Sequence, residues 1–209
     1  CKLCVVPYTR GAEFSRSIDE LVLEAKQLVS NGSREITLLG QNVNAYNYKE
    51  KKLSDLIIKI SEIKDLKRIR YTTSHPIDFT EDLIQVHKNC KKLMPLIHLP
   101  VQSGSNKILQ DMNRKHTTEK YLEIIEKLKI INTKIKFSSD FIIGYPEETQ
   151  DDFEKTLLLM KKVKFISSYS FIYSARPGTP SFSLKRIDDD LAKKRLIAFQ
   201  NVAKKIKTE

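Results

Sequence analysis

The sequence has few cysteines and no long apolar run. Its three cysteines, Cys1, Cys4 and Cys90, are too few and too unevenly spaced for a disulfide scaffold, which predicts a reducing, cytoplasmic setting. No apolar run approaches the roughly 18 residues of a membrane span, and no charged leader precedes an apolar segment. We therefore expect a soluble protein with no membrane partner. Internal repeats, low-complexity tracts and interdomain linkers are also missing, which favours one domain.

Positive charge exceeds negative charge. There are 37 lysines and arginines against 26 aspartates and glutamates, a formal net charge of +11. A basic surface attracts phosphate groups over long distances, which makes a polyanionic partner plausible. A lysine-rich sequence with solvated helix faces would explain the same number. We expect the closing helix to be such a solvated face, with basic residues Lys193, Lys194, Arg195, Lys204, Lys205 and Lys207.

Short apolar segments alternate with helical patterns. In residues 18–29 the apolar positions fall on one helix face, Ser17 and Glu20 form a capping box, and Asn31-Gly32 supplies a stop. Similar helical patterns cover residues 53–63, 121–131, 153–160 and roughly 190–205. The segments expected to form buried strands are 35–39, 68–73, 95–99, 136–143 and 168–173.

This alternation predicts an α/β fold with parallel strands, either a barrel or a doubly wound sheet. The unusual polar and glycine-containing segments follow the carboxyl ends of the expected strands. That edge is where α/β proteins assemble their sites. The segments are 40–42, 73–76, 100–105, 144–146 and 174–178.

The pair Cys1-x-x-Cys4 fits three roles: half of a zinc site, a redox pair, or two ligands of an iron–sulfur cluster. Zinc needs two more soft ligands, and Cys90 lies in a lysine-rich stretch after a helix. A redox pair would open a helix, whereas Pro7 predicts an extended segment directly after Cys4. Taken alone, the pair does not decide among these roles.

The segment CKLCVVPYTRGAEFSR, residues 1–16, resembles the cluster-binding loop of radical S-adenosylmethionine methylthiotransferases. That loop is a Cys-x3-Cys-x2-Cys motif running into a proline, an Arg-Gly and a Ser-Arg, and Cys1 and Cys4 match its second and third cysteines. The resemblance continues in the family's order through LLGQNVNAY, TTSHP, HLPVQSGS, SDFIIGYPEET and YSARPGT. Glu147 departs from the family, which usually has glycine there.

The resemblance implies an incomplete (β/α) barrel, TIM-like and of the radical S-adenosylmethionine type, as a core domain over residues 1–209. Because the chain opens on Cys1 without an initiator methionine, we expect it to be truncated at both ends. The first cysteine, the first strand, an N-terminal methylthiotransferase domain and a C-terminal TRAM domain would then lie outside it. The implied cofactors are a [4Fe–4S] cluster at Cys1 and Cys4, S-adenosylmethionine, and a second [4Fe–4S] cluster in the N-terminal domain.

The segments GQNVNAY and LPVQSGS match the type of methylthiotransferase that acts on N6-isopentenyladenosine in tRNA. The implied reaction adds a methylthio group to carbon 2 of that base, next to the anticodon, with electrons from a donor such as flavodoxin or ferredoxin. We expect a monomer, and we expect this fragment alone to be inactive. The alternatives are a methylthiotransferase for threonylcarbamoyladenosine tRNA or a ribosomal-protein aspartate, or a non-catalytic basic RNA-binding module.

The resemblance also implies site residues. Those expected to contact S-adenosylmethionine are Gln41, Ser74, Gln102, Ser103, Ile142, Ile143 and Gly144. Ser103-Gly104-Ser105 could offer backbone N–H groups to a carboxylate, although an N-cap would explain the serines equally well. Arg10, Arg16 and Arg176 are expected to grip substrate carboxylate or phosphate. Of the four histidines, we expect structural roles for His75 and His98 and surface positions for His87 and His116.

Overall fold

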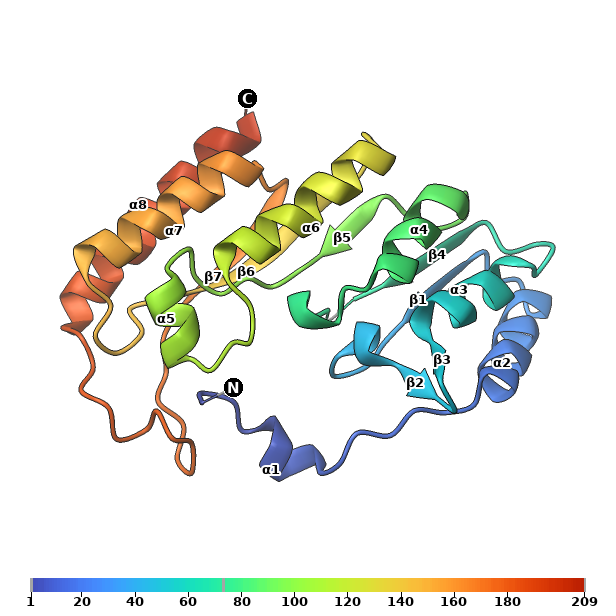
Figure 1. Cartoon of the computed structure of the whole chain (residues 1–209), viewed down its shortest axis with the longest axis horizontal. Helices are drawn as coiled ribbons and strands as arrows, with labels where there is room; N and C mark the ends of the chain where they lie inside the picture. The colour runs from blue at the N-terminus through green and yellow to red at the C-terminus, as the bar shows by residue number, and fades with distance from the viewer. Residues whose placement is uncertain (1, 73, 209) are drawn as a thin grey trace. The chain divides into compact units, whose positions relative to one another are not determined.

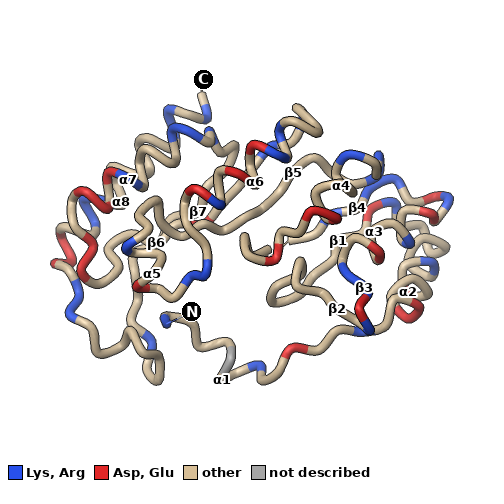
Figure 2. Tube along the Cα trace, in the orientation of Figure 1, with Lys and Arg blue, Asp and Glu red and all other residues tan. Residues whose placement is uncertain are grey.

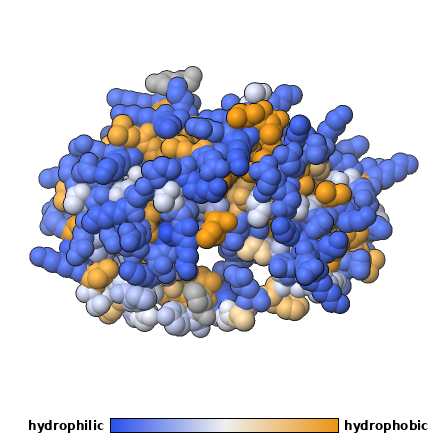
Figure 3. All heavy atoms as spheres, viewed as in Figure 1, coloured by the Kyte–Doolittle hydropathy of each residue, from blue (hydrophilic) through white to orange (hydrophobic). Residues whose placement is uncertain are grey.

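The computed structural model describes residues 2–72 and 74–208, so Cys1 and Thr73 lie outside the described residues. The chain divides into two compact units. Unit 1 contains residues 1–12, 100–123 and 137–209, and unit 2 contains residues 13–99 and 124–136. Within the described residues, no helix is both long enough and apolar enough to cross a membrane. On the face shown in Figure 3, hydrophilic residues predominate and apolar ones are scattered.

Unit 2 is built on a parallel strand pair. Strand β1 (Glu35–Leu38) pairs with β4 (Arg68–Tyr71), with Ile36 opposite Ile69. Helix α3 packs against α2 and against α4, as Figure 1 shows. Strand β5 and a two-stranded hairpin complete the unit. The bounds are α2 (Ile18–Ser30), β2 (Asn47–Tyr48), β3 (Lys51–Lys52), α3 (Leu53–Ser61), α4 (Glu81–Asn89) and β5 (Leu96–His98), with 3-10 turns at Val43–Ala45 and Pro76–Asp78.

Unit 1 contains a second parallel pair, β6 (Lys136–Ile143, from its second residue) and β7 (Ser167–Ile172). Two helices, α7 (Gln150–Val163) and α8 (Asp189–Thr208), pack against each other, and α8 also packs on β7 (Figure 1). The ring of Phe141 on β6 lies 4.7 Å from the ring of Phe199 on α8, centroid to centroid, so an aromatic contact joins sheet to helix. Two short helices are α1 (Val6–Arg10) and α5 (Asn106–Asp111), and α6 (Thr118–Ile131) begins in unit 1 and ends in unit 2.

The predicted secondary structure is confirmed in its main elements. Each expected strand is present within two residues of its predicted ends, and the strand pairs described above are parallel. Ser17 caps α2 by accepting the Glu20 N–H at 3.2 Å, and the helix ends before Gly32, whose φ is +100°. Helices α4 and α5 and the hairpin were not predicted from the sequence patterns.

The prediction that Pro7 keeps its segment extended is wrong. Helix α1 begins at Val6, with the proline in its first turn. The first N–H groups of a helix have no partner within the helix, so a proline there removes no hydrogen bond and its fixed φ suits the helix. The argument from Pro7 against a helix after Cys4 therefore fails.

Gly104 allows one loop to touch the backbone of α7. A Cβ atom at this position would lie 2.4 Å from the Lys155 carbonyl oxygen and 2.6 Å from the Thr156 Cα atom. The Gly104 N–H also donates to the Thr156 hydroxyl oxygen at 2.9 Å. No side chain fits between this loop and the helix.

We expect Gly104→Ala to lower the free energy of unfolding by about 3 kcal/mol, because the added methyl group must push two backbone segments apart. Urea denaturation measures the loss. Gly178→Ala is the matched control, since Gly178 has φ +80° but nothing within 4 Å of an added Cβ. The control variant should lose only about 1–2 kcal/mol of unfolding free energy, because its alanine must adopt the left-handed conformation. Equal losses in the two variants would contradict the close approach.

Candidate functional site

The loop after β5 is fastened to β6 through Gln102. The Gln102 N–H donates to the Asp140 carbonyl, and the Gln102 carbonyl accepts the Ile142 N–H, both at 2.9 Å. The φ of Gln102 is +77°, an unusual value for a residue with a side chain. Two hydrogen bonds therefore hold the Gln102 backbone in this unusual conformation, and they fix the point from which its half-buried side chain extends.

The next three residues form an internal network. The Ser103 side chain is fully buried, and its hydroxyl accepts the Ser105 N–H at 3.1 Å. The Ser105 hydroxyl donates to Asp152 at 2.5 Å and accepts the Ile108 N–H, which caps α5. Since the N–H groups of Gly104 and Ser105 both have partners within the protein, the geometry favours the N-cap explanation of this segment over an anion site.

The end of β6 leads into a tight turn beside α8. Ile143 is fully buried, whereas Ile142 is partly buried against a cluster that includes Tyr145 and Tyr173. Gly144 has φ +73°, and a Cβ atom there would meet Ala192 and Ile187 at 3.1 Å. Glu147 has φ +62°, a left-handed conformation that glycine adopts more easily. The glycine that is usual in the resembling family would therefore suit this position.

A buried ion pair fixes that turn. The Arg195 Nη1 atom lies 2.9 Å from Glu148 Oε2, and both side chains are almost fully buried. The same nitrogen donates to the Glu148 carbonyl oxygen at 2.9 Å, and Glu148 Oε2 accepts the Gly144 N–H at 3.0 Å. The prediction that Arg195 belongs to a solvated face is wrong, because the guanidinium pairs with a carboxylate that the loop buries.

Burial raises the pKa of Glu148, and the Gly144 N–H and Arg195 act in the opposite direction. A carboxyl group whose pKa is raised by folding holds its proton more tightly in the folded state than in the unfolded state. Its contribution to stability is therefore present at low pH and is lost as the pH rises from the ordinary value toward the raised one. The Arg195 cation limits this loss.

We expect Arg195→Met to lower the free energy of unfolding by about 3–5 kcal/mol at pH 8, because it leaves a buried carboxylate without its cation. The loss should be smaller at pH 5, where Glu148 can take up a proton. Urea denaturation at both pH values tests this. The double variant Glu148→Gln/Arg195→Met should regain part of the stability and lose the pH dependence. A loss that is the same at both pH values would contradict the assignment.

The cysteine loop packs on the core of unit 1. The Lys2 N–H donates to the Met112 carbonyl at 2.9 Å, and the Lys2 carbonyl accepts the Ser181 hydroxyl at 3.0 Å. Leu3 packs against the buried cluster that contains Met112. Cys4, the next residue, is a half-buried free thiol. Two backbone anchors therefore position the loop from which Cys4 projects.

The half-buried Arg114 lies close to Cys4. Burial lowers the pKa of Arg114 to about 10, and negative charge on Cys4 and Asp140 acts in the opposite direction. Arg114 also donates to the Pro100 carbonyl at 3.0 Å. Cys4 is a thiol, a ligand type that holds iron–sulfur clusters, on a loop fixed by two backbone hydrogen bonds, so it fits a cluster ligand. Cys1 lies outside the described residues, and no group of three His, Cys, Asp or Glu forms a metal site among those described.

In unit 2, asparagine side chains join the loops after β1 and β4. Asn44 donates to the His75 carbonyl at 2.9 Å and accepts the His75 N–H at 2.8 Å. Asn42 donates to Asp78 at 2.7 Å. Gln41, beside them, is exposed. Ser74 is 5% exposed, and its hydroxyl has no hydrogen-bond partner among the described residues. A buried hydroxyl without a partner indicates a missing ligand or water, so Ser74 fits a cofactor contact.

The three arginines expected to meet substrate are exposed. Arg16 forms an ion pair with Glu24 at 2.7 Å, in which both side chains are about half exposed. Exposed pairs of this kind contribute little to stability. Arg10 lies at the end of α1, and Arg176 lies in the loop after β7. Their positions leave the proposed substrate contacts open to test.

The prediction of surface positions for His87 and His116 is wrong. Both side chains are buried, at 4% and 6% exposure. His87 forms a 2.6 Å hydrogen bond with the Tyr71 hydroxyl and stacks on Phe79, and burial lowers its pKa to about 4. Its helix α4 was not predicted, which is why its inward face was missed. His98 lies in β5 and Cys90 ends α4, each half buried.

Sequence reasoning also missed residues that shape the site. Glu148 and the asparagines Asn42 and Asn44 lie in the segments that resemble the methylthiotransferases, so those segments were the available signal. No pattern in the sequence marks Arg114 or Arg195, because the role of each depends on the residues that folding brings beside it.

The parallel βα units and the cysteine loop define the class of protein. The chain belongs to the Radical SAM superfamily, whose family model matches residues 1–160. Membership of this superfamily implies S-adenosylmethionine and a [4Fe–4S] cluster as cofactors.

Among curated proteins, the chain is 61% identical over 204 residues to the tRNA-2-methylthio-N(6)-dimethylallyladenosine synthase of Pelagibacter ubique, covering 96% of this chain and 46% of that protein. It is 54% identical over 214 residues to the protein of the same name from Wolbachia pipientis subsp. Culex pipiens, covering 100% of this chain and 49% of the relative. The chain thus spans about half the length of the curated relatives it matches.

Solved structures confirm the fold. Coproporphyrinogen III oxidase (HemN) from Escherichia coli, a radical SAM enzyme, superposes with a TM-score of 0.68 at 15% identity, over 90% of this chain and 46% of that one. Methylornithine synthase (PylB) gives 0.66 at 13% identity, over 99% of this chain and 58% of that one. The predicted fold, an incomplete TIM-like (β/α) barrel of the radical SAM type, is therefore confirmed.

Proposed function

We propose that this chain is the core of a tRNA methylthiotransferase that adds a methylthio group to carbon 2 of N6-isopentenyladenosine next to the anticodon. The observation that carries the proposal is the 61% identity, over 96% of the chain, to a relative named for that product. The same name recurs at 54% identity over the whole chain. The natural partner is then tRNA, in the cytoplasm.

In this proposal Cys1 and Cys4 hold a [4Fe–4S] cluster. When bound, the cluster and S-adenosylmethionine supply the radical chemistry that opens the C–H bond of the base. A donor such as flavodoxin or ferredoxin supplies electrons, and a second cluster in an N-terminal methylthiotransferase domain supports sulfur transfer. The working protein is a monomer.

The remaining site residues bind and orient. The residues proposed to contact S-adenosylmethionine are the ones that the resembling segments imply: Gln41, Ser74, Gln102, Ser103, Ile142, Ile143 and Gly144. The Glu148–Arg195 pair keeps the turn after β6 in one conformation, so its backbone offers a fixed surface to an adenine ring. The substrate phosphates are held by Arg10, Arg16 and Arg176.

The function is tested with the whole protein, purified without oxygen, and tRNA that carries isopentenyladenosine. We expect the wild type to form 2-methylthio-isopentenyladenosine, detected by mass spectrometry, and Cys1→Ala/Cys4→Ala to form none. The double variant should also lose the iron and sulfide of this site, counted after subtracting the second cluster. Cys90→Ala should keep both, since Cys90 ends α4 as an ordinary half-buried thiol. Product or unchanged iron in the double variant would refute the proposal.

A second test separates binding from stability at Ser74. Ser74→Ala should weaken S-adenosylmethionine binding by about 1–3 kcal/mol in calorimetry, because a buried group of the cofactor loses its partner. Its free energy of unfolding should not fall, since the hydroxyl has no partner within the described chain. Ser54→Ala is the control: Ser54 donates to Asp82 at 2.6 Å, so that variant should lose stability and keep its cofactor affinity. Equal cofactor affinities in wild type and Ser74→Ala would remove Ser74 from the site.

A further inference from the structure

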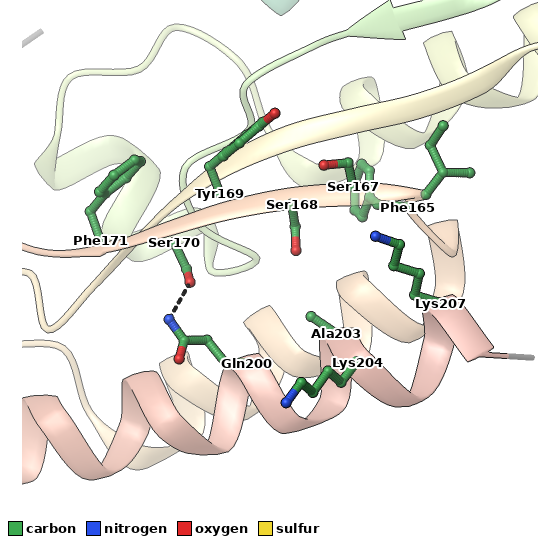
Figure 4. Close-up of a pocket in the computed structure, with 11 residues that line it drawn as sticks. Phe165, Ser167, Ser168, Tyr169, Ser170, Phe171, Gln200, Ala203, Lys204 and Lys207 are labelled. Carbon is green, nitrogen blue, oxygen red and sulfur yellow. Dashed lines mark hydrogen bonds between the residues drawn. The ribbon is translucent and has the colours of Figure 1, made fainter.

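A groove lined by both polar and apolar residues runs between β7 and α8 in unit 1. Its volume is about 380 Å³. The Ser168 and Ser170 hydroxyls point from the strand toward the helix, and the Gln200 amide donates to the Ser170 hydroxyl at 3.5 Å (Figure 4). Lys207 points from the helix toward the strand, and Lys204, which also lines the groove, extends away from the strand. The polar residues are Ser167, Ser168, Ser170, Gln200, Lys204 and Lys207. Lysine, serine and glutamine are the side chains with which proteins contact nucleic-acid phosphates.

The charge of this groove has one sign. No acidic residue is among those that line it. Residues 191–208 of α8 contain no aspartate or glutamate, and the acidic residues of the helix are confined to its start (Figure 2). Helix α7 packs against α8 and also ends on lysines, Lys161 and Lys162. A phosphate in the groove would therefore be attracted by the lysines, and no acidic residue of the lining would repel it.

The opposite face of the same strand is aromatic. Tyr169 and Phe171 alternate with Ser168 and Ser170, so they project away from α8, as Figure 4 shows. Both side chains are exposed, at 55% and 58%. In the described part of the chain, no strand pairs with the other edge of β7. Phosphate contacts and aromatic rings thus lie on the two faces of one open strand.

This combination is how proteins hold single-stranded nucleic acid: a basic groove tracks the backbone, and aromatic side chains stack on the bases. We propose that the groove between β7 and α8 docks a single-stranded loop of RNA, with phosphates at Lys204 and Lys207 and bases stacked on Tyr169 and Phe171. The identity of this RNA rests on the proposed function, because a substrate tRNA would supply such a single-stranded loop. The docking surface itself is outside the cofactor site.

Binding of a fluorescent anticodon stem-loop RNA to the whole protein tests the phosphate contacts without any turnover. Lys204→Gln/Lys207→Gln should bind about tenfold more weakly at 0.15 M salt, and the slope of log K against log salt should fall by about 1.4 for two contacts. Lys194→Gln/Lys205→Gln is the control, because it removes the same charge from the same helix at residues outside the groove. Lys204→Arg/Lys207→Arg keeps both positive charges and should bind the RNA as tightly as the wild type. If both glutamine double variants lost the same affinity for the RNA, the proposal would be overturned, because the loss would then follow from net charge and not from the groove.

The aromatic contacts have their own test. Phe171→Ala should weaken the same RNA at least about fivefold and leave the salt slope unchanged, because stacking involves no counterion release. Phe182→Ala is the control, since Phe182 is 51% exposed in the same unit and does not line the groove. Unchanged affinity in Phe171→Ala would overturn the stacking and point to a protein segment on this strand. If these variants weaken RNA binding while the wild type makes no methylthio product, the groove stands and the proposed function fails.

Discussion

The buried ion pair between Arg195 and Glu148 is the constraint on which much of unit 1 depends. A charge buried without its partner is costly, so α8 cannot leave the turn after β6 without exposing or neutralising both groups. The same carboxylate holds the Gly144 N–H, and the same guanidinium holds the Glu148 carbonyl. The last helix therefore determines the shape of a turn that lies some fifty residues earlier in the sequence.

Side chains that bond to the backbone of a neighbouring loop recur across both units. In unit 2 the Asn44 amide pairs with both backbone groups of His75, as a neighbouring strand would. In unit 1 the Thr156 hydroxyl accepts the Gly104 N–H where α7 touches the loop after β5. Loops at a strand end have unpaired N–H and C=O groups, and each unpaired buried group is unfavourable. These contacts satisfy the groups and keep the loops in place for binding.

Two buried serines among the proposed cofactor contacts differ in their hydrogen bonds. Ser74 is buried and its hydroxyl has no partner in the described chain, whereas Ser103 is buried and its hydroxyl is bonded within the loop. Both were predicted as cofactor contacts from the resembling segments. The sequence does not distinguish them, because a serine after a strand looks the same whether its hydroxyl faces a ligand or caps a turn.

By itself, the sequence determined the order of strands and helices, because apolar periodicity reports which face of each element is buried. It also indicated the family, since the segments at the strand ends resemble those of that family in their order. Tertiary structure alone decided which charges are buried. From the sequence, Arg195 was expected on the solvated face of a lysine-rich helix and His87 on the surface. Packing places Glu148 beside Arg195 and Tyr71 beside His87. Burial depends on what other elements bring to a side chain, and no local pattern contains that information.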